Sequence, residues 1–463
     1  SNSSKPPSSA SPYDKGNKGK SDSEDDDAKN SSAEDKAHKT TEKGTPAESS
    51  QSDDSNRSAG RQPGSQGFWR SETPVPESTI PHYPSVCVIC GKGLDVPEGS
   101  QPYMGYYVYE LEKTASGIRI SCTLHHYYSA VCHCGHETKA QPGEGCISHV
   151  EGRKKDLKLT EYTMVGPMLA TFIAALSVRF RMSRVKIKEF LSYWLSTELS
   201  VGTIDKCIRE AGVACYPVVE ELVEELQEQK IVNLDETPWY EKGCFKWLWV
   251  AISTTVAVFY VGTRKKEEML KLITSAFVGW LVTDGYRAYR SYEKRQRCLA
   301  HLIRKAVALT GAVDEKAQKM GDWFLRELRG LIKAMAEDGE DGTRECNLIL
   351  ARLKRACNLG SEEKHSKLRA LAKEILNDWD AVVAFVKNPE LPPTNNDAER
   401  ALRHAVISRR ISFGTRTTEG SRAYTALLSV IETCRLRNQD PWQYIAQTIA
   451  LGRKGLAPSI IPG

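Results

Sequence analysis

The order of apolar segments between Lys230 and about residue 310 constrains the fold most. Three segments with strand character come first, and strands then alternate with helices. The segments are Ile231–Asp235, Phe245–Ile252, Val256–Val261, a helix over Lys265–Ser275, Trp280–Asp284, a helix near Tyr286–Glu293, Gln296–Ala300 and a helix from His301. Hairpin strands followed by alternating strands and helices predict a mixed α/β sheet covered by helices.

Composition divides the rest of the chain of 463 residues into further units, so we expect a multidomain protein. The order above is the one that RNase H-like folds use. The expected units are a disordered Ser-rich linker (1–80), a small β-rich module (81–150), a helical region (151–229), the first part of an RNase H-like core (230–310), a helical insertion broken at 338–342 (311–390), the second part of the core (391–450) and a tail (451–463).

Charge and cysteine content give only weak information about the class of protein. The net charge of +5 is too small to indicate a nucleic-acid partner by itself. The 13 cysteines are irregularly spaced, and the chain has no secretory signal and no apolar run near 18 residues. We therefore expect a cytoplasmic protein with reduced thiols and no membrane partner.

Two short helices joined by a turn lie within the helical region. Ser183–Leu195 and Ser200–Arg209 are predicted helices, the second capped by Ser200. This layout resembles a helix-turn-helix, and the competing interpretation is ordinary helix packing. Its cations would serve as phosphate contacts; they include Arg184, Lys186, Lys188, Lys206 and Arg209.

Three acidic residues are candidates for one cation site. Asp235 and Asp284 each end an apolar strand, and Glu399 lies on a helix that follows Pro392-Pro393. If the two strands are neighbours, the three carboxylates converge, and their oxygens suit two Mg²⁺ or Mn²⁺ ions. Glu236 and Asp397 are the adjacent alternatives.

The β-rich module carries Cys87-Val-Ile-Cys90 and Cys132-His-Cys134. A C-x-x-C pair with a second cysteine pair predicts a structural Cys₄ zinc site. The second pair departs from C-x-x-C, so one ligand is open to substitution; the candidates are Cys122, His125, His126 and His133. Buried cysteines without a metal are the alternative.

Several strings resemble the large transposase of the IS66 family of insertion sequences, between about residues 84 and 446. They are Asn233-Leu-Asp-Glu-Thr-Pro-Trp239, Thr283-Asp-Gly-Tyr-Arg-Ala-Tyr289, Cys298-Leu-Ala-His301 with Arg304, and Thr394-Asn-Asn-Asp-Ala-Glu-Arg400. The resemblance implies that Asp235, Asp284 and Glu399 are catalytic and that Cys298 and His301 support them. Four arginines lie on the predicted helix of Glu399 and its continuation, and they either contact DNA phosphates or simply face solvent: Arg400, Arg403, Arg409 and Arg410.

The expected function is therefore transposition of a mobile element in a prokaryotic cytoplasm, on the nucleoid when DNA is bound. The enzyme would bind the terminal inverted repeats, cut to free 3′-hydroxyls and join them to target DNA, as a homodimer or larger synaptic complex. The resemblance also implies accessory proteins from the same element. The alternatives are an RNase H-like nuclease and a non-catalytic DNA-binding regulator derived from a transposase.

Overall fold

The computed structural model describes residues 74–148, 157–336 and 340–463. The predicted disordered linker at 1–80 lies mostly outside these described residues, and so does part of the predicted break at 338–342. From Ser78 onward the chain forms strands. These strands are β1 (Ser78–His82), β2 (Met104–Thr114), β3 (Gly117–Tyr127), β4 (Ser129–Val131), β5 (Glu137–Lys139), β6 (Glu144–Ser148) and β7 (Leu157–Thr160).

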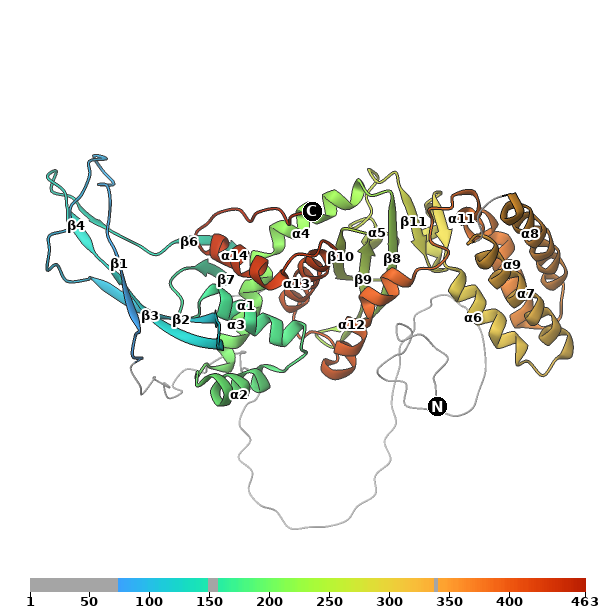
Figure 1. Cartoon of the computed structure of the whole chain (residues 1–463), viewed down its shortest axis with the longest axis horizontal. Coiled ribbons are helices and arrows are strands. Elements are labelled where there is room, and N and C mark those ends of the chain that lie inside the picture. The colour runs from blue at the N-terminus through green and yellow to red at the C-terminus, as the bar shows by residue number, and fades with distance from the viewer. Residues whose placement is uncertain (1–73, 149–156, 337–339) are drawn as a thin grey trace, which may run out of the picture. The chain divides into compact units, whose positions relative to one another are not determined.

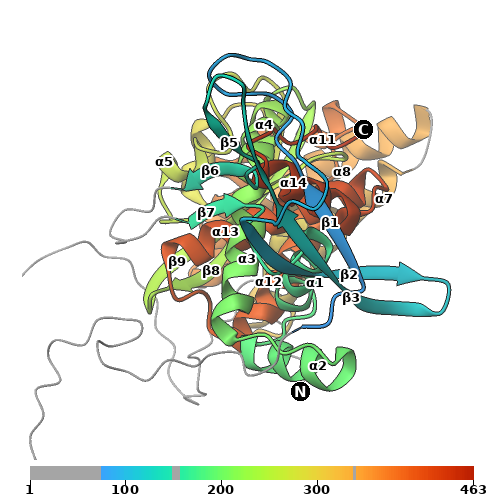
Figure 2. The ribbon, with the colours of Figure 1, turned by 90° about the vertical axis from the view of Figure 1, so that its left-hand side faces the viewer.

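The N-terminal module is β-rich, as predicted. Its largest sheet has the order β1-β3-β2, and Figure 2 shows the long β2–β3 hairpin beside β1. Strands β4 and β5 form a separate pair, and so do β6 and β7. The expected helical region (151–229) is wrong at Leu157–Thr160, because Leu157 and Leu159 alternate with less buried residues and pair as β7 with β6.

Four helices follow, and they include the predicted two-helix layout. They are α1 (Pro167–Val178), α2 (Arg184–Leu195), α3 (Val201–Ala214) and α4 (Tyr216–Gln227). The Ser200 side chain accepts a hydrogen bond from Thr203 N and caps α3 as predicted, and the Ser183 side chain likewise caps α2 by accepting from Lys186 N.

The predicted mixed sheet is present, with the strand order β10-β9-β8-β11-β12 (Figure 1). Its strands are β8 (Ile231–Glu241), β9 (Cys244–Ile252), β10 (Ala257–Gly262), β11 (Trp280–Thr283) and β12 (Arg295–Arg297). Strands β8 to β10 are antiparallel neighbours, and β8, β11 and β12 run parallel.

The connecting helices are shorter than expected. The predicted helix over Lys265–Ser275 is only α5 (Lys266–Met269), and the one near Tyr286–Glu293 is a single 3₁₀ segment at Arg287–Ser291. The last predicted strand ends at Arg297, because Cys298 already caps the next helix.

The remaining helices form two groups. The first has its own apolar core around Phe324, Leu328 and Leu353. It contains the predicted insertion together with α6, which was expected in the first part of the core: α6 (Leu299–Thr310), α7 (Glu315–Ala334), α8 (Glu340–Ser361), α9 (Ser366–Asn377), α10 (Trp379–Val382) and α11 (Ala384–Lys387). The second group returns to the sheet: α12 (Asn396–Ser412), α13 (Thr418–Leu436) and α14 (Pro441–Arg453).

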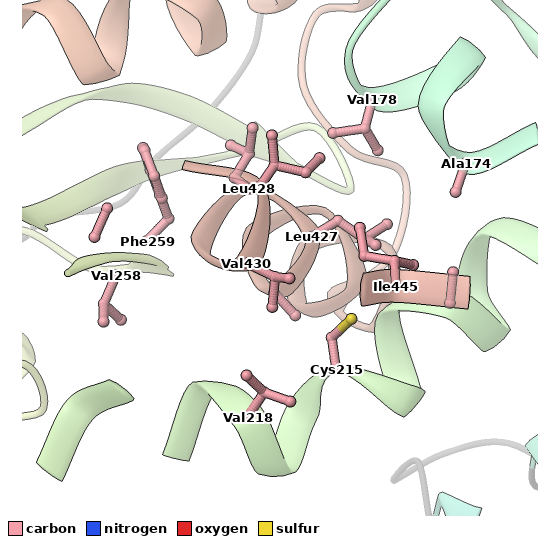
Figure 3. Packing of buried hydrophobic residues seen from close by; sticks show 14 of the residues in the cluster. Ala174, Val178, Cys215, Val218, Val258, Phe259, Leu427, Leu428, Val430 and Ile445 are labelled. Atoms are coloured by element: carbon pink, nitrogen blue, oxygen red, sulfur yellow. The ribbon is translucent and has the colours of Figure 1, made fainter. Parts of the chain in front are cut away.

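Helix α13 joins the five-stranded sheet to the preceding helices. Figure 3 shows its Leu427, Leu428 and Val430 among side chains from α1, α4, β10 and α14. The helix also covers the free edge of β10. Phe259 N donates to Ser429 Oγ at 2.9 Å, and Ala257 N donates to Thr433 Oγ1 at 3.0 Å. Edge strands need such partners for their free N–H groups.

We expect Thr433→Val to lower the free energy of unfolding by about 1–3 kcal/mol, because the isosteric change leaves a buried β10 N–H without its acceptor. Thr448→Val is the matched control, since the buried Thr448 hydroxyl only donates to the Tyr444 carbonyl of its own helix. Urea unfolding of the two variants checks this; equal losses would contradict the role given to Thr433.

No helix in the described ranges is long and apolar enough to cross a membrane.

Candidate active site

Asp235 and Asp284 lie at the same level of two neighbouring parallel strands. Thr283 pairs with Leu234 in the β8–β11 register, so Asp284 and Asp235 are the next residues on each strand. Strand β11 ends there, whereas β8 continues to Glu241. Asp235 is therefore inside a strand and not at its end as predicted, but the predicted meeting of the two acids follows from the register.

Glu399 is held near these acids by the start of α12. Asn395 is completely buried, and it does not cap its helix with its side chain. Its amide instead donates to the Leu234 carbonyl at 2.9 Å, and its Oδ1 accepts from Asn233 at 2.9 Å. These two bonds attach the first turn of α12 to β8 immediately before Asp235, and Glu399 follows one turn later.

The acids repel one another in the absence of a cation. Asp235 is only 5% exposed. Burial, and then the negative charges of Glu236, Asp284 and Glu399, raises the pKa of Asp235 well above its usual range. A buried carboxyl with this environment is stabilised as a charged group when a cation is bound.

We expect the metal-free protein to lose stability through Asp235 as the pH rises. The unfolded carboxyl titrates near 3.8, whereas the folded one holds its proton to higher pH, so the folded state binds more protons in this window. Each unit of pKa difference corresponds to about 1.4 kcal/mol. We therefore expect the melting temperature of Asp235→Asn to exceed that of the wild type by an amount that grows between pH 4 and pH 8. This difference should shrink when Mg²⁺ is added. A difference independent of pH would contradict the raised pKa.

The two alternative acids are bound to other partners. Burial, and then the charge of Asp284, raises the pKa of Glu236 to about 7, and its carboxylate pairs with Arg264 at 2.7 Å and accepts from the Tyr289 hydroxyl. The Arg264 guanidinium lies over the rings of Trp247 and Tyr286, each 4.2 Å away. Glu236 thus belongs to a supporting network beside the site.

Asp397 lies on the other side of the α12 start from Glu399. Its carboxylate is half exposed and pairs with Arg400. Glu399, by contrast, approaches α6, where its Oε1 lies 3.3 Å from Arg304 Nη2 and 3.9 Å from His301 Nδ1. This geometry favours Glu399 over Asp397 as the third acid.

Cys298 and His301 lie beside Glu399 at the start of α6. Cys298 Sγ accepts a hydrogen bond from Asn395 N at 3.1 Å, so the thiol also holds the segment before α12. Burial, and then the positive charge of Arg304, lowers the pKa of His301, which keeps the imidazole neutral at pH 7.

Arg297 and Gly285 form a part of the site that the sequence interpretation missed. The buried Arg297 guanidinium lies so close to Gly285 that an added Cβ would be 2.0 Å from its Nη2. Asp378 and Glu374 of the insertion hold the guanidinium in place. The glycine after Asp284 is therefore required by this close approach, and a Gly following a strand-end Asp was the only available sequence signal.

The four predicted cysteines come together. Their Sγ atoms all lie within 4.8 Å of one another, with Cys87 and Cys132 buried and Cys90 and Cys134 exposed. Hydrogen bonds from backbone N–H groups of Cys90 and Ile89 lower the pKa of Cys87 to about 6. Four converging thiols with a stabilised thiolate fit a tetrahedral Zn²⁺ ion.

Some of the basic residues predicted to contact DNA are exposed, and others form ion pairs within the protein. The exposed ones are Lys186, Lys188, Arg403 and Arg410, and Arg400 is exposed but pairs with Asp397. Lys206 is half-buried. Arg184 contacts Asp205 at 3.4 Å, and Arg209 bonds to Asp205 and to the buried Glu419, which joins α3 to α13.

Arg409 requires a correction, because it is completely buried. Its guanidinium donates to Thr237 Oγ1 at 3.0 Å and to the Pro238 carbonyl, on the part of β8 that extends beyond β11. The side chain thus joins α12 to β8 and, because it is buried, is out of reach of a DNA phosphate.

Comparisons with known proteins show the family of this chain. The family model described as "Transposase IS66 family" matches residues 163–423, which is more than half of the chain, and the chain belongs to this family. The uncharacterized protein y4jD of Sinorhizobium fredii is 26% identical over 237 residues, covering 47% of this chain and 44% of that protein. The uncharacterized protein y4qI of the same organism is 23% identical over 300 residues, covering 57% and 55%. The chain spans about half the length of these curated relatives.

Proposed function

We propose that this chain is a DNA transposase of the DDE type, in which Asp235, Asp284 and Glu399 hold two Mg²⁺ or Mn²⁺ ions for strand cleavage and strand transfer. The observation that supports the proposal is the parallel β8–β11 register, in which Asp235 and Asp284 follow the paired residues Leu234 and Thr283, together with the bond from Asn395 at the start of α12 to Leu234. Membership of the IS66 family supports the same assignment.

The catalytic core would be of the RNase H-like type. Three antiparallel strands followed by two parallel ones, in the order β10-β9-β8-β11-β12, support this fold. The first acid then lies on the central strand β8 and the second after its parallel neighbour, while the third comes from a helix beyond the insertion.

The protein groups have distinct tasks in this proposal. The three carboxylates bind the cations by oxygen, and Arg264 with Tyr289 keeps Glu236 out of the cation site. Asp235, Asp284 and Glu399 would hold the paired cations, which would supply activation of the attacking water or 3′-hydroxyl and stabilisation of the leaving oxygen. Cys298 accepts the Asn395 N–H and so keeps the segment before Glu399 in position, and His301 lies beside the Glu399 carboxylate.

The substrate would be double-stranded DNA, both the transposon ends and the target. Exposed Lys186 and Lys188 on α2 and Arg403 and Arg410 on α12 would contact its phosphates. A Zn²⁺ ion on the four cysteines would be structural and would shape the N-terminal module for end recognition. Two ends must react in one complex, so we propose a dimer or larger synaptic assembly, with accessory proteins of the same element.

The test is strand transfer by the purified chain. A labelled, pre-nicked transposon-end duplex is incubated with supercoiled target DNA in Mg²⁺ or in EDTA, beside a duplex with a scrambled end sequence. We expect joined product only with the true end and only with Mg²⁺. Cutting without joining and without end preference would favour the nuclease, and specific binding without any cutting would favour the regulator.

A further inference from the structure

The start of α6 and the start of α12 bring together three ligand atoms of different chemical types. The Sγ of Cys298, a ring nitrogen of His301 and a carboxylate oxygen of Glu399 all lie within 4.8 Å of one another. Cys298 caps α6 and His301 follows three residues later, so both side chains lie on the same side of the first turn. Glu399 approaches them from α12.

We propose that Cys298, His301 and Glu399 form an additional cation site that is selective for a soft divalent ion of the zinc type. Thiolate and imidazole ligands favour Zn²⁺ and Co²⁺, whereas the all-carboxylate set of Asp235, Asp284 and Glu399 favours Mg²⁺. Three protein ligands leave a fourth position for water, as in open zinc sites.

The spacing of the ligands suits such an ion after a small adjustment. Two ligand atoms on one tetrahedral Zn²⁺ ion are about 3.3–3.6 Å apart, because each bond is about 2.0–2.3 Å long. His301 Nδ1 and Glu399 Oε1 are 3.9 Å apart. Side-chain rotations that move the ligand atoms by less than about 1 Å would therefore complete the site. The ion replaces the thiol proton of Cys298, which passes to solvent.

The hydrogen bonds of His301 and Cys298 also favour a bound cation. His301 Nδ1 is buried, and within the described part of the chain it has no hydrogen-bond partner. Buried polar atoms are nearly always satisfied, so this nitrogen is free to accept a metal ion or a water. The Cys298 sulfur receives the Asn395 N–H at 3.1 Å, an interaction that favours a metal-bound thiolate.

Glu399 would then be shared between two cation sites. An ion held by Cys298 and His301 draws the Glu399 carboxylate away from Asp235 and Asp284, so a soft cation would inhibit the Mg²⁺-dependent reaction. This consequence rests on the proposed function, whereas the cation site itself does not. Arg304 can keep its contact through the second carboxylate oxygen.

The test uses the full chain loaded with one Zn²⁺ per molecule, so that the four-cysteine site is filled. Titration with Co²⁺ is followed by the thiolate-to-cobalt absorption band. We expect one further Co²⁺ to bind, and we expect Cys298→Ser and His301→Ala each to weaken its binding at least about tenfold, as loss of a metal-site residue does. Cys357→Ser changes a buried thiol in α8 and should leave binding unchanged.

His301→Ala retains the Cys298–Asn395 contact, so it keeps the test valid if Cys298→Ser fails to fold. Absence of a further band in the wild type, or a band that survives in both variants, would overturn the proposal. Strand transfer is then measured in Mg²⁺ with and without added Zn²⁺. We expect Zn²⁺ to inhibit the wild type, and we expect it not to inhibit whatever activity His301→Ala retains. Cobalt binding with no strand transfer at all would keep the cation site and reject the transposase function.

Discussion

Asp235→Asn should lower the rate of strand transfer in Mg²⁺ by about a thousandfold or more. The amide removes one anionic ligand from the cation site, and cation stabilisation of a phosphoryl transition state amounts to several kcal/mol. Because Asp235 is buried and its pKa is raised by burial and neighbouring acids, the neutral amide should not destabilise the metal-free protein at pH 7.5. Single-turnover joining assays and thermal unfolding measure the two effects.

Asp397→Asn is the matched control for this loss. It is the same chemical change, two residues before Glu399, but its carboxylate is half exposed and pairs with Arg400. We expect it to retain strand transfer within about twofold, as surface changes typically do. Equal losses in the two variants, or an unfolded Asp235→Asn protein, would contradict the assignment of Asp235.

Removal of zinc should unfold the N-terminal module while leaving the five-stranded sheet folded. Beside the four cysteines the module has only the short β4–β5 strand pair, and structural zinc sites supply about 10–16 kcal/mol of apparent binding free energy in small domains. Cys90→Ser should have the same effect as a chelator. Hydrogen exchange over residues 78–148 should rise strongly in both cases, and exchange in β8 and β9 should change little.

Cys122→Ser provides the control in the same module. Cys122 is buried in β3 but is not one of the four converging cysteines. We expect its exchange pattern to resemble that of the wild type and its zinc content to stay at the wild-type value. Loss of zinc in Cys122→Ser but not in Cys90→Ser would show that the ligands are assigned wrongly.

The strands of the sheet and the meeting of its acids were predictable because both depend on local patterns. Apolar runs that end near Asp235 and Asp284 specify two strands, and parallel neighbours bring their ends to one level. The same reasoning placed Asp235 at a strand end, which is wrong, because β8 continues along β9 to Glu241 after β11 has ended. The length of a neighbouring strand cannot be inferred from the strand itself.

The roles of Arg409 and Asn395 depend on contacts between distant segments. An arginine on a basic helix resembles a phosphate ligand in the sequence, but here it bonds to Thr237 and Pro238, more than 170 residues earlier. Asn395 resembles a helix cap, yet its amide reaches the Leu234 carbonyl of β8. Side chains of these types have several possible partners, and only the fold selects among them.

The most direct test of the central claim is the binding of Mn²⁺ to the zinc-loaded full chain, measured by calorimetry. If Asp235, Asp284 and Glu399 form one cation site, Asp235→Asn and Glu399→Gln should each weaken Mn²⁺ binding at least about tenfold, while Asp397→Asn should not. Mn²⁺ affinity that is unchanged in Asp235→Asn and Glu399→Gln, with both variants folded, would contradict the site.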